Sequence, residues 1–473
     1  MSKVSNKKKI DFTQGPLFWR LILFALPIMA SGILQMLYNA ADKFIVGQFS
    51  GDPTALGAIG CTATLGAFII NFMAGIGGGT GVVVAQLFGA KREKETSRAV
   101  HTAMILAFVL SLALTGVGYL SLEPMLRLLG TQDEFMPGAT LYLSITYIGI
   151  VATAIYNFGA SILRAVGDSK TSLIIGMVSG IINVVFNMLF VCLFGMSVDG
   201  VAIATVMSQY FSAGAVIVVL MRRRGESYQF SFKKLAVDKV LLARIVRIGV
   251  PTGLQSCCFT ITNLITVSAV NSFPPEYVTA FSVSSNIDSF LDVASGSFMQ
   301  SAMNATGQNY GACKPKRIKR VFYFSVLQAA LVVFSISMVM RIFRAELAGI
   351  FVSEDTVGRA DIISAVVEWT GVMLSTYFMQ GVMNAVMGTV RGLGYSLSPL
   401  IFNIVGTCVV RAIWIFLVFP LEPFHNFAGL AMLYPVSWTT ASLMFLVLVI
   451  ISFGKIKKMK DSESEETAEK VNA

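Results

Sequence analysis

The chain has 473 residues, of which 55% are hydrophobic and only 13% are charged, and its mean hydropathy is +0.72. These values lie far from those of a soluble globular domain and indicate an all-α polytopic membrane protein. The net charge of +10 does not indicate nucleic-acid binding, because the basic residues lie in short loops beside apolar segments. Six scattered cysteines and two distant histidines favour no metal cluster or haem site, and we expect no cofactor.

Twelve apolar stretches are long enough to cross a bilayer, which takes about 20 residues. In the first half they span approximately residues 17–46, 55–88, 96–120, 137–163, 171–194 and 200–221. In the second half they span approximately residues 244–272, 278–306, 318–340, 362–390, 399–419 and 426–453. Because the runs are long and continuously apolar, they predict helices and not the short alternating strands of a membrane barrel.

The two halves of the sequence repeat each other. The segment Gln86 to Lys91 (QLFGAK) returns 222 positions later as Gln308 to Cys313 (QNYGAC). Other pairs recur at nearly the same offset: Pro27 with Pro251, Arg164 with Arg391, and Gly200-Val201-Ala202 with Gly429-Leu430-Ala431. The repeat predicts two six-helix lobes, and because six is even, they are expected to be related by a pseudo-twofold axis along the membrane normal.

The charge of the loops predicts the topology. Lysine and arginine gather in alternate loops, which places both termini in the cytoplasm of a multi-pass protein of the bacterial plasma membrane. We expect a cytoplasmic N-terminal segment (1–16), an N-lobe (17–221), a basic linker (222–243), a C-lobe (244–453) and a disordered tail (454–473). The linker could lie on anionic lipid or be a solvated connector. Residues 341–361 predict a short external amphipathic helix.

Asp42 is the first candidate for chemistry, because an ionisable side chain within an apolar span is costly. Gln35, Tyr38 and Asn39 precede it at helical spacing and are expected to share its face, next to a substrate cavity. The alternative is an ordinary charge at a helix end, paired with Lys43.

Amide and hydroxyl groups in later spans could complete an ion site. Asn183 and Asn187 lie four residues apart on one helix face, and Asn157 and Thr205 offer further oxygen atoms. Na⁺ prefers such oxygens, so Asp42, Asn183, Asn187 and Thr205 could bind it, or Asp42 alone could take up a proton. Hydrogen bonds that merely join helices explain the same amides equally well.

The second half carries its own polar residues inside the spans. Asp288 and Asp292 lie at i and i+4, Gln255 and Gln380 are neutral, and Arg411 lies well within the eleventh span. A water-filled substrate cavity would explain all of them, and local pairing of Arg411 with an acid is the alternative.

Pro27 and Pro251 interrupt the first span of each half at matching places. A proline there removes a backbone hydrogen bond, so Pro27 could be a hinge that moves Asp42 or a static kink.

These pieces together resemble the multidrug and toxic compound extrusion (MATE) family over roughly residues 10–455. The resemblance rests on Pro27, on Asp42 to Gly47 (DKFIVG), on Gln86 to Ala90 (QLFGA), on Leu163 to Asp168 (LRAVGD), on Asn183 to Asn187, on Gly200 to Thr205 (GVAIAT) and on Gln308 to Gly311. It implies a twelve-helix antiporter that exports amphipathic, often cationic, compounds in exchange for Na⁺ or H⁺. The family's coupling acid falls on Asp42, and its partners fall on Asn157, Asn183 and Thr205.

The chain departs from the family pattern at several positions. Many members have an acid where this chain has Asn187, and acids of the seventh and tenth helices are replaced by Gln255, or its neighbours, and Gln380. The losses lower the negative charge and leave open which ion is used and whether the C-lobe binds one.

We therefore expect a monomeric secondary active transporter of small organic compounds in a lipid bilayer. The closest alternative is a flippase for a lipid-linked saccharide, which favours several buried basic residues for a pyrophosphate, whereas Arg411 is nearly alone. An intramembrane enzyme would need a cluster of nucleophile, base or metal ligands, which the sequence does not offer.

Overall fold

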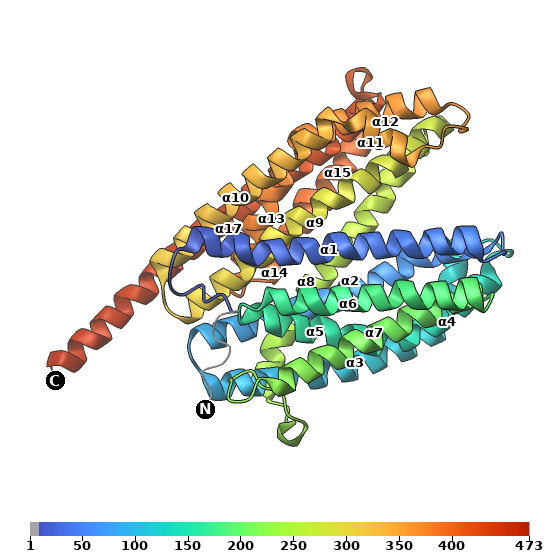
Figure 1. Ribbon diagram of the computed structural model, residues 1–473. Helices are drawn as coiled ribbons and strands as arrows, with labels where there is room; N and C mark the ends of the chain where they lie inside the picture. The colour runs from blue at the N-terminus through green and yellow to red at the C-terminus, as the bar shows by residue number, and fades with distance from the viewer. Residues whose placement is uncertain (1–8, 473) are drawn as a thin grey trace. The chain divides into compact units, whose positions relative to one another are not determined.

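The computed structural model describes residues 9–472, except for the side chains of residues 259–261, 264, 455 and 457–472. Within this range the regular structure is entirely helical. The chain forms two compact units (Figure 1). Unit 1 comprises residues up to Asp11 and Ala30–Cys257, and unit 2 comprises Phe12–Met29 and the residues from Cys258 onward.

Unit 1 is a bundle in which α3, α5, α6 and α7 run alongside one another (Figure 1). It contains the second part of α1 (Leu17–Phe49) and the first part of α8 (Lys239–Val270). Between them lie α2 (Ala55–Gly89), α3 (Glu93–Leu128), α4 (Met136–Ile148), α5 (Ile150–Ala165), α6 (Ser169–Asn187), the π-helical η1 (Met188–Leu193), α7 (Val198–Arg222) and the short η2 (Phe232–Lys234).

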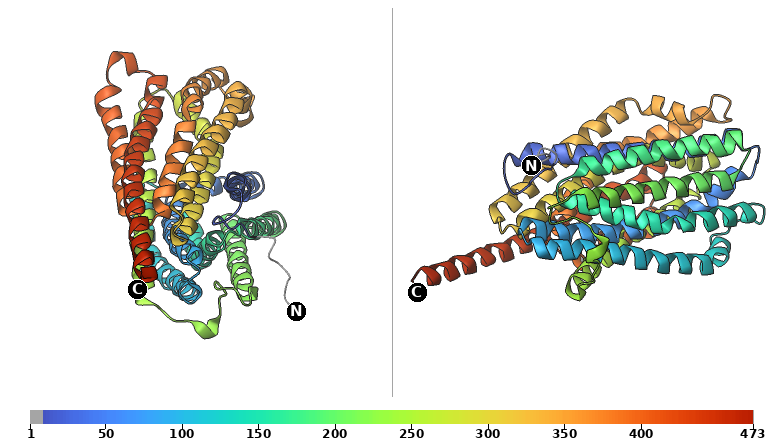
Figure 2. Two further views of the ribbon diagram at one scale, coloured as in Figure 1. Left: turned by 90° about the vertical axis from the view of Figure 1, so that its left-hand side faces the viewer. Right: turned by 60° about the horizontal axis from the view of Figure 1, so that its bottom comes forward.

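Unit 2 packs α9, α10 and α13 against one another (Figure 2). Its elements are α9 (Pro275–Gly311), α10 (Pro315–Ile342), α11 (Arg344–Phe351), α12 (Arg359–Thr376), α13 (Phe378–Gly392), α14 (Leu397–Asn403), the π-helical η3 (Ile404–Val409), α15 (Val410–Ile413), the π-helical η4 (Trp414–Val418), η5 (Glu422–Phe424), α16 (Phe427–Ala431) and α17 (Leu433–Asn472).

The boundaries of the two units differ from the predicted lobes, because α1 and α8 each divide between them. The first turns of α1 bond to unit 2: Gln328 donates to the carbonyl of Phe18 at 2.8 Å, and Ser301 to that of Leu21 at 3.0 Å. The linker and the start of α8 instead belong to unit 1. Contacts between residues far apart in the sequence, and not the midpoint of the chain, therefore set the boundaries of the two units.

Close packing of glycines holds the start of α8 against α2. A Cβ atom added to Gly79 would lie 2.5 Å from Cα of Gly249, and one added to Gly75 would lie 2.4 Å from Cα of Gly253. Four glycines thus allow the two backbones to approach closely, as small residues do between membrane helices.

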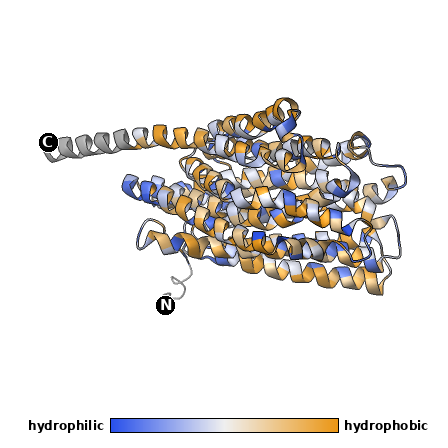
Figure 3. Ribbon diagram, turned by 90° about the horizontal axis from the view of Figure 1, so that it is seen from above, coloured by the Kyte–Doolittle hydropathy of each residue, from blue (hydrophilic) through white to orange (hydrophobic). Residues whose placement is uncertain are grey.

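The helices have the length and surface of membrane spans. Within the described residues, eight helical segments are long and apolar enough, and the number rises to ten if α4 with α5 and α12 with α13, pairs bent by 47° and 43°, each form one span. Helices α8 and α9 are also long but more polar. Only 22–39% of the residues in the eight apolar windows are buried, so much apolar surface is exposed. Figure 3 shows hydrophobic residues spread along the helices. Such surface requires lipid.

The turns preserve the sequence duplication. Lys91 and Cys313 both have positive φ, at 57° and 52°, a conformation that costs energy for residues other than glycine. The same bonds close both turns: Arg92 N donates to Leu87 O at 3.1 Å, and Lys314 N donates to Asn309 O at 3.0 Å. The repeated sequences therefore fold into the same helix ending, which supports duplication of one unit.

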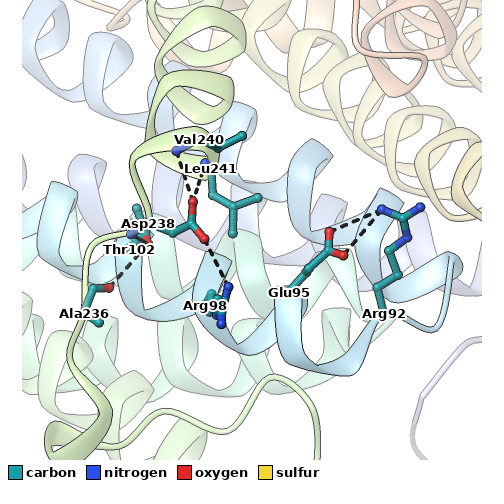
Figure 4. A network of polar contacts seen from close by, with 8 residues as sticks. All are labelled: Arg92, Glu95, Arg98, Thr102, Ala236, Asp238, Val240 and Leu241. Carbon is teal, nitrogen blue, oxygen red and sulfur yellow. Dashed lines mark hydrogen bonds and ion pairs between the residues drawn. The ribbon is translucent and has the colours of Figure 1, made fainter.

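Unit 1 fixes the basic linker to its helices. Arg223 forms an ion pair of 2.6 Å with Asp168, whose side chain is completely buried. Farther along, Asp238 N donates to Thr102 Oγ1 at 3.0 Å, and its carboxylate lies 3.7 Å from Arg98 (Figure 4). The first bond holds the linker at the start of α6 and the others hold it on α3, and the exposed side chains of Phe232 and Leu235 project from it.

The structure bears on two local predictions, the short helix within residues 341–361 and the disordered tail from residue 454. The short helix expected within residues 341–361 is confirmed as α11. The tail expected to be disordered from residue 454 instead continues α17 to Asn472. The segment contains alanine, glutamate and lysine, which have high helix propensity. The prediction of disorder considered only charge and polarity and did not take helix propensity into account.

Candidate ion-coupling site

Unit 1 contains a partly open cavity of about 340 Å³ beside Asp42. Helix α1 contributes Asn39, Asp42 and Lys43, and the remaining walls come mainly from α2, α4 and α7. The lining combines apolar with hydroxyl and amide side chains: Ile59, Thr62, Ile69, Ile70, Met73, Tyr142, Thr146, Tyr147, Ile150, Thr153, Thr205 and Gln209. A cavity of this size and composition suits an amphipathic small molecule.

Asp42 is bound by Asn187. The Nδ2 group of Asn187 donates a hydrogen bond to Oδ1 of Asp42, across 145 positions of sequence. Asn187 is completely buried, whereas Asp42 is half-buried and lines the cavity. A hydrogen bond to a charged group contributes about 1.5–3 kcal/mol, so this contact fixes the carboxylate on the cavity wall.

The side-chain oxygen of Asn187 is a candidate acceptor for a ligand. Its Oδ1 is buried and has no hydrogen-bond partner among the described residues. A buried acceptor without a partner costs free energy, which a bound cation, a proton-bearing group or a water would recover.

Asn183 and Thr205 extend the polar wall. Asn183 Nδ2 lies 3.5 Å from Thr205 Oγ1, at the long limit of a hydrogen bond, and Thr205 lines the cavity. Asn157 does not join them, because its amide donates to Thr153 O in its own helix at 2.9 Å. The structure thus brings together four of the five predicted coupling residues.

This oxygen set fits a small hard cation. Asp42 supplies a carboxylate, Asn187 and Asn183 supply amide oxygens, and Thr205 supplies a hydroxyl oxygen, which are ligand types that Na⁺ prefers. The same carboxyl could instead carry one proton. The donor set is compatible with both ions.

Irregular backbone surrounds the site. The helix changes from α to π immediately after Asn187, at Met188, and π-helical turns frequently lie at functional sites. The bend between α4 and α5 falls at Gly149, where an added Cβ would clash with Gln209 Oε1, a cavity-lining atom. Glycine at this position leaves room for the end of the Gln209 side chain, which would have to shift if a Cβ were present.

Only some of the residues predicted to line a cavity with Asp42 do line it. Asn39 lines it, whereas Gln35 is exposed. Tyr38 packs its ring on Gly180 and donates to the carbonyl of Met177 at 3.1 Å. Gln255 is completely buried, which corrects its expected place on an open cavity wall.

The remaining predicted cavity residues form a separate polar cluster inside unit 2. Gln380 donates to Asp292 at 3.1 Å, and Arg411 donates from Nε to Ser437 at 3.2 Å. Asp288 interacts electrostatically with both Asp292 and Arg411. The printed partners of Arg411 are the uncharged Ser437 and the ring of Tyr434, so its pairing with an acid, the alternative interpretation, stays a prediction.

The hydroxyl- and amide-bearing cavity residues that were missed from the sequence are Thr62, Tyr142, Thr146, Tyr147, Thr153 and Gln209. Thr205 and Gln209 lie four positions apart, as do Tyr142 and Thr146, so helical spacing from a known site residue could have found Gln209. Tyr142 had no such anchor, because polar aromatic residues at helix ends are common in membrane proteins.

Helix α1 is continuous through Pro27, and it passes from unit 2 to unit 1 between Met29 and Ala30. The proline lies two residues before this point. The hinge role of Pro27 stays a prediction.

A helical membrane protein with an acid, amides and a ligand-sized cavity inside one bundle belongs to the class of membrane transporters. The MatE family model matches residues 27–189 and 251–417, and the chain therefore belongs to this family. Its members are transporters and not enzymes.

Known proteins support this assignment over most of the chain. YpnP of Bacillus subtilis, named a probable multidrug resistance protein, is 29% identical over 406 residues, covering 85% of this chain and 89% of YpnP. A protein of Shewanella oneidensis named an FAD transporter is 25% identical over 68% of this chain and 71% of its own length. The crystal structure of MATE in complex with MaL6 has a TM-score of 0.87 at 20% identity and covers 96% of this chain and all of that one. The two-lobe, twelve-helix fold is thus confirmed.

Proposed function

We propose that this protein is a cation antiporter that exports amphipathic, often cationic, organic compounds in exchange for Na⁺ or H⁺. The observation that carries the proposal is the Asp42 carboxylate, held by Asn187 on the wall of a 340 Å³ cavity. The similarity to proteins named for multidrug resistance supports the substrate class.

Coupling follows if ion and substrate use the same carboxylate. A substrate with a cationic group is attracted by ionised Asp42, and its apolar body contacts Ile59, Ile70 and Met73. Arrival of Na⁺ or a proton neutralises Asp42 and removes this attraction, so the substrate leaves. The ion must bind the two access states with different affinity for this exchange to drive transport.

Pro27 is proposed as the hinge of alternating access. A proline inside a helix leaves one carbonyl without its backbone donor and lowers the cost of bending there. Asp42 lies on the same helix, fifteen positions further on and past the crossing from unit 2 to unit 1. Bending at Pro27 would therefore change the environment of the coupling carboxylate. We further propose a monomer, and on the basis of loop charge we propose that both of its termini lie in the cytoplasm.

The test is dye efflux from proteoliposomes under separately imposed Na⁺ and pH gradients. Wild type should respond to at least one gradient, and Asp42→Asn should abolish the response. The matched control is Glu123→Gln, because Glu123 is an exposed acid that forms an ion pair with the nearby Arg127; this variant should retain wild-type efflux.

Two outcomes would contradict the proposal. If neither gradient drives efflux in wild type, antiport is the wrong mechanism, and if Asp42→Asn keeps full activity, the coupling site is wrong. A flippase for a lipid-linked saccharide would translocate that lipid in the same vesicles without moving dyes.

A further inference from the structure

The basic linker of unit 1 exposes a surface that mixes apolar and cationic side chains. Phe232, Leu235 and Val237 are 58%, 45% and 47% exposed, and the exposed Lys233 and Lys234 lie between the first two. We call these five residues the linker face. Three apolar side chains that project from one short segment form a patch, and such patches mark contact sites.

Buried contacts hold the linker face in place. His101 of α3 is 2% exposed, and its Nδ1 donates to Ser97 O at 2.7 Å, because a carbonyl can only accept. The opposite ring nitrogen, Nε2, therefore accepts the bond of 3.1 Å from Ser231 N. Phe230 stacks on the same ring at 5.3 Å and meets Phe232 edge-on at 5.1 Å. The imidazole thus fixes the two residues that precede the linker face.

The linker binds α3 at the level where the surface of this helix changes from charged to apolar. Thr102, which bonds to the linker (Figure 4), lies nine positions after Glu93, the first residue of α3, or about 13 Å along the helix axis. Arg98 is exposed before this level, whereas Phe108 and Val109 are exposed after it. Lipid headgroups lie at such a boundary, because the hydrocarbon core accepts apolar and not charged side chains. Figure 1 shows the linker projecting from the side of unit 1.

The linker carries more positive charge than its own acids neutralise. Residues 222–240 contain six arginines and lysines and two acids. Both acids already pair with cations outside this range: Glu226 lies 2.6 Å from Lys9, and Asp238 lies 3.7 Å from Arg98. Neither lysine of the linker face forms an ion pair with a described residue. Their charge is therefore available to an anion outside the protein.

We propose that the linker face is a docking site for anionic lipid. Phe232, Leu235 and Val237 enter the acyl boundary of the adjoining leaflet, and Lys233 and Lys234 bind the headgroup phosphates. Zwitterionic lipid would satisfy the apolar side chains alone. The unneutralised lysines select lipids that carry a net negative charge.

Lipid at this face acts on the start of α8. Oδ1 of Asp238 accepts bonds from Val240 N at 3.0 Å and from Leu241 N at 3.2 Å (Figure 4). These bonds join the linker to the first turn of α8, which begins at Lys239. Anchoring the linker face therefore holds this turn at the level of the headgroups.

Quenching of tryptophan fluorescence by brominated lipids tests the proposal on the full-length protein in vesicles. Phe232→Trp places a reporter on the linker face, and the signal of the four native tryptophans is subtracted with the wild-type chain. Phosphatidylcholine vesicles carry a small fraction of either brominated phosphatidylglycerol or brominated phosphatidylcholine. Both lipids should quench the reporter. The anionic lipid should do so at a mole fraction at least about tenfold lower, because each lysine near the surface contributes about fivefold in affinity.

Two double variants in the Phe232→Trp chain separate local from general charge. Lys233→Gln/Lys234→Gln should abolish most of the preference for phosphatidylglycerol and keep the quenching by phosphatidylcholine, because the apolar side chains remain. The matched control, Lys316→Gln/Lys319→Gln, removes two exposed lysines at the start of α10 and should keep the preference. Salt at 1 M should weaken the preference, because it shortens the Debye length to about 3 Å. All variants should melt at the temperature of the Phe232→Trp chain.

Four outcomes would overturn the proposal. Absence of quenching by both lipids would show a solvated connector, and equal quenching would show lipid contact without selection of charge. Relief of quenching by millimolar inorganic phosphate would make free phosphate the ligand. Quenching that appears only when the protein is diluted in the bilayer would indicate that a second copy of the chain covers this face.

The inference is independent of the proposed antiport. Quenching requires no gradient and no substrate, and Asp42→Asn should leave it unchanged. Loss of gradient-driven efflux with intact lipid selection would refute antiport alone, and efflux without lipid selection would refute the docking site alone.

Discussion

Replacing Gly79 by alanine tests how α8 is held in unit 1. The new Cβ would lie 2.5 Å from Cα and N of Gly249 and 3.1 Å from the carbonyl oxygen of Ile245, where ordinary contacts begin at 3.4 Å. The obstructing atoms are backbone, so no side chain can rotate away and the two helices must separate locally by about 1 Å. Overpacking of this kind costs about 1–3 kcal/mol.

The same substitution also raises helix propensity by about 1 kcal/mol, which would hide part of the loss. Gly60→Ala is the matched control, because Gly60 lies on the same helix and a Cβ there would meet nothing within 4 Å. Both variants gain the same helix propensity, so the difference between their free energies of unfolding measures the cost of the steric clash alone. We expect Gly79→Ala to be less stable than Gly60→Ala by about 1–3 kcal/mol.

Equilibrium unfolding in mixed micelles with increasing SDS measures this difference. Equal stability of the two alanine variants would refute the close approach of α2 and α8, and with it the assignment of the first turns of α8 to unit 1.

Three further predictions concern charged groups. Asn187→Asp places a second carboxylate against Asp42, so its thermal stability should fall below wild type in alkaline Na⁺-free buffer and recover on adding Na⁺ or acid; recovery with neither would contradict the ion site. Asp168→Ala strips Arg223 of its buried partner and should cost about 3–5 kcal/mol in SDS unfolding, whereas a loss below about 1 kcal/mol would show the pair to be dispensable. Hydrogen bonds from Thr54 and Ser197 lower the pKa of Asp52 in the loop after α1. The stability that Asp52 adds over Asp52→Asn should thus be constant above its ordinary pKa of about 3.9 and vanish as the pH falls below it; thermal melts across pH check this, and a gap that widens in acid would refute it.

The sequence was a better guide to the contact between Asp42 and Asn187 than to the boundaries of the two units. An acid in an apolar span and two amides at i and i+4 are local patterns, and a buried charge must find polar partners, which led to Asn187. Asn157 looked equivalent, but its own helix satisfies its amide, and no sequence pattern distinguishes that bond from a long-range one. The crossing of α1 and α8 between units depends on contacts such as Gly79 with Gly249, which are 170 positions apart.

The division of α1 and α8 between the units has a consequence for how this gene can be rearranged. The first segment of each repeat belongs to the unit that the other repeat forms. A fragment cut at the midpoint of the chain would therefore lack one segment of its unit. It would also carry one segment whose packing partners lie in the missing half. Chimaeras that splice one half onto a relative's other half should therefore assemble only when both exchanged segments match their new hosts. Chimaeras joined near Met29 and Cys257 would be cut at the boundaries of the two units.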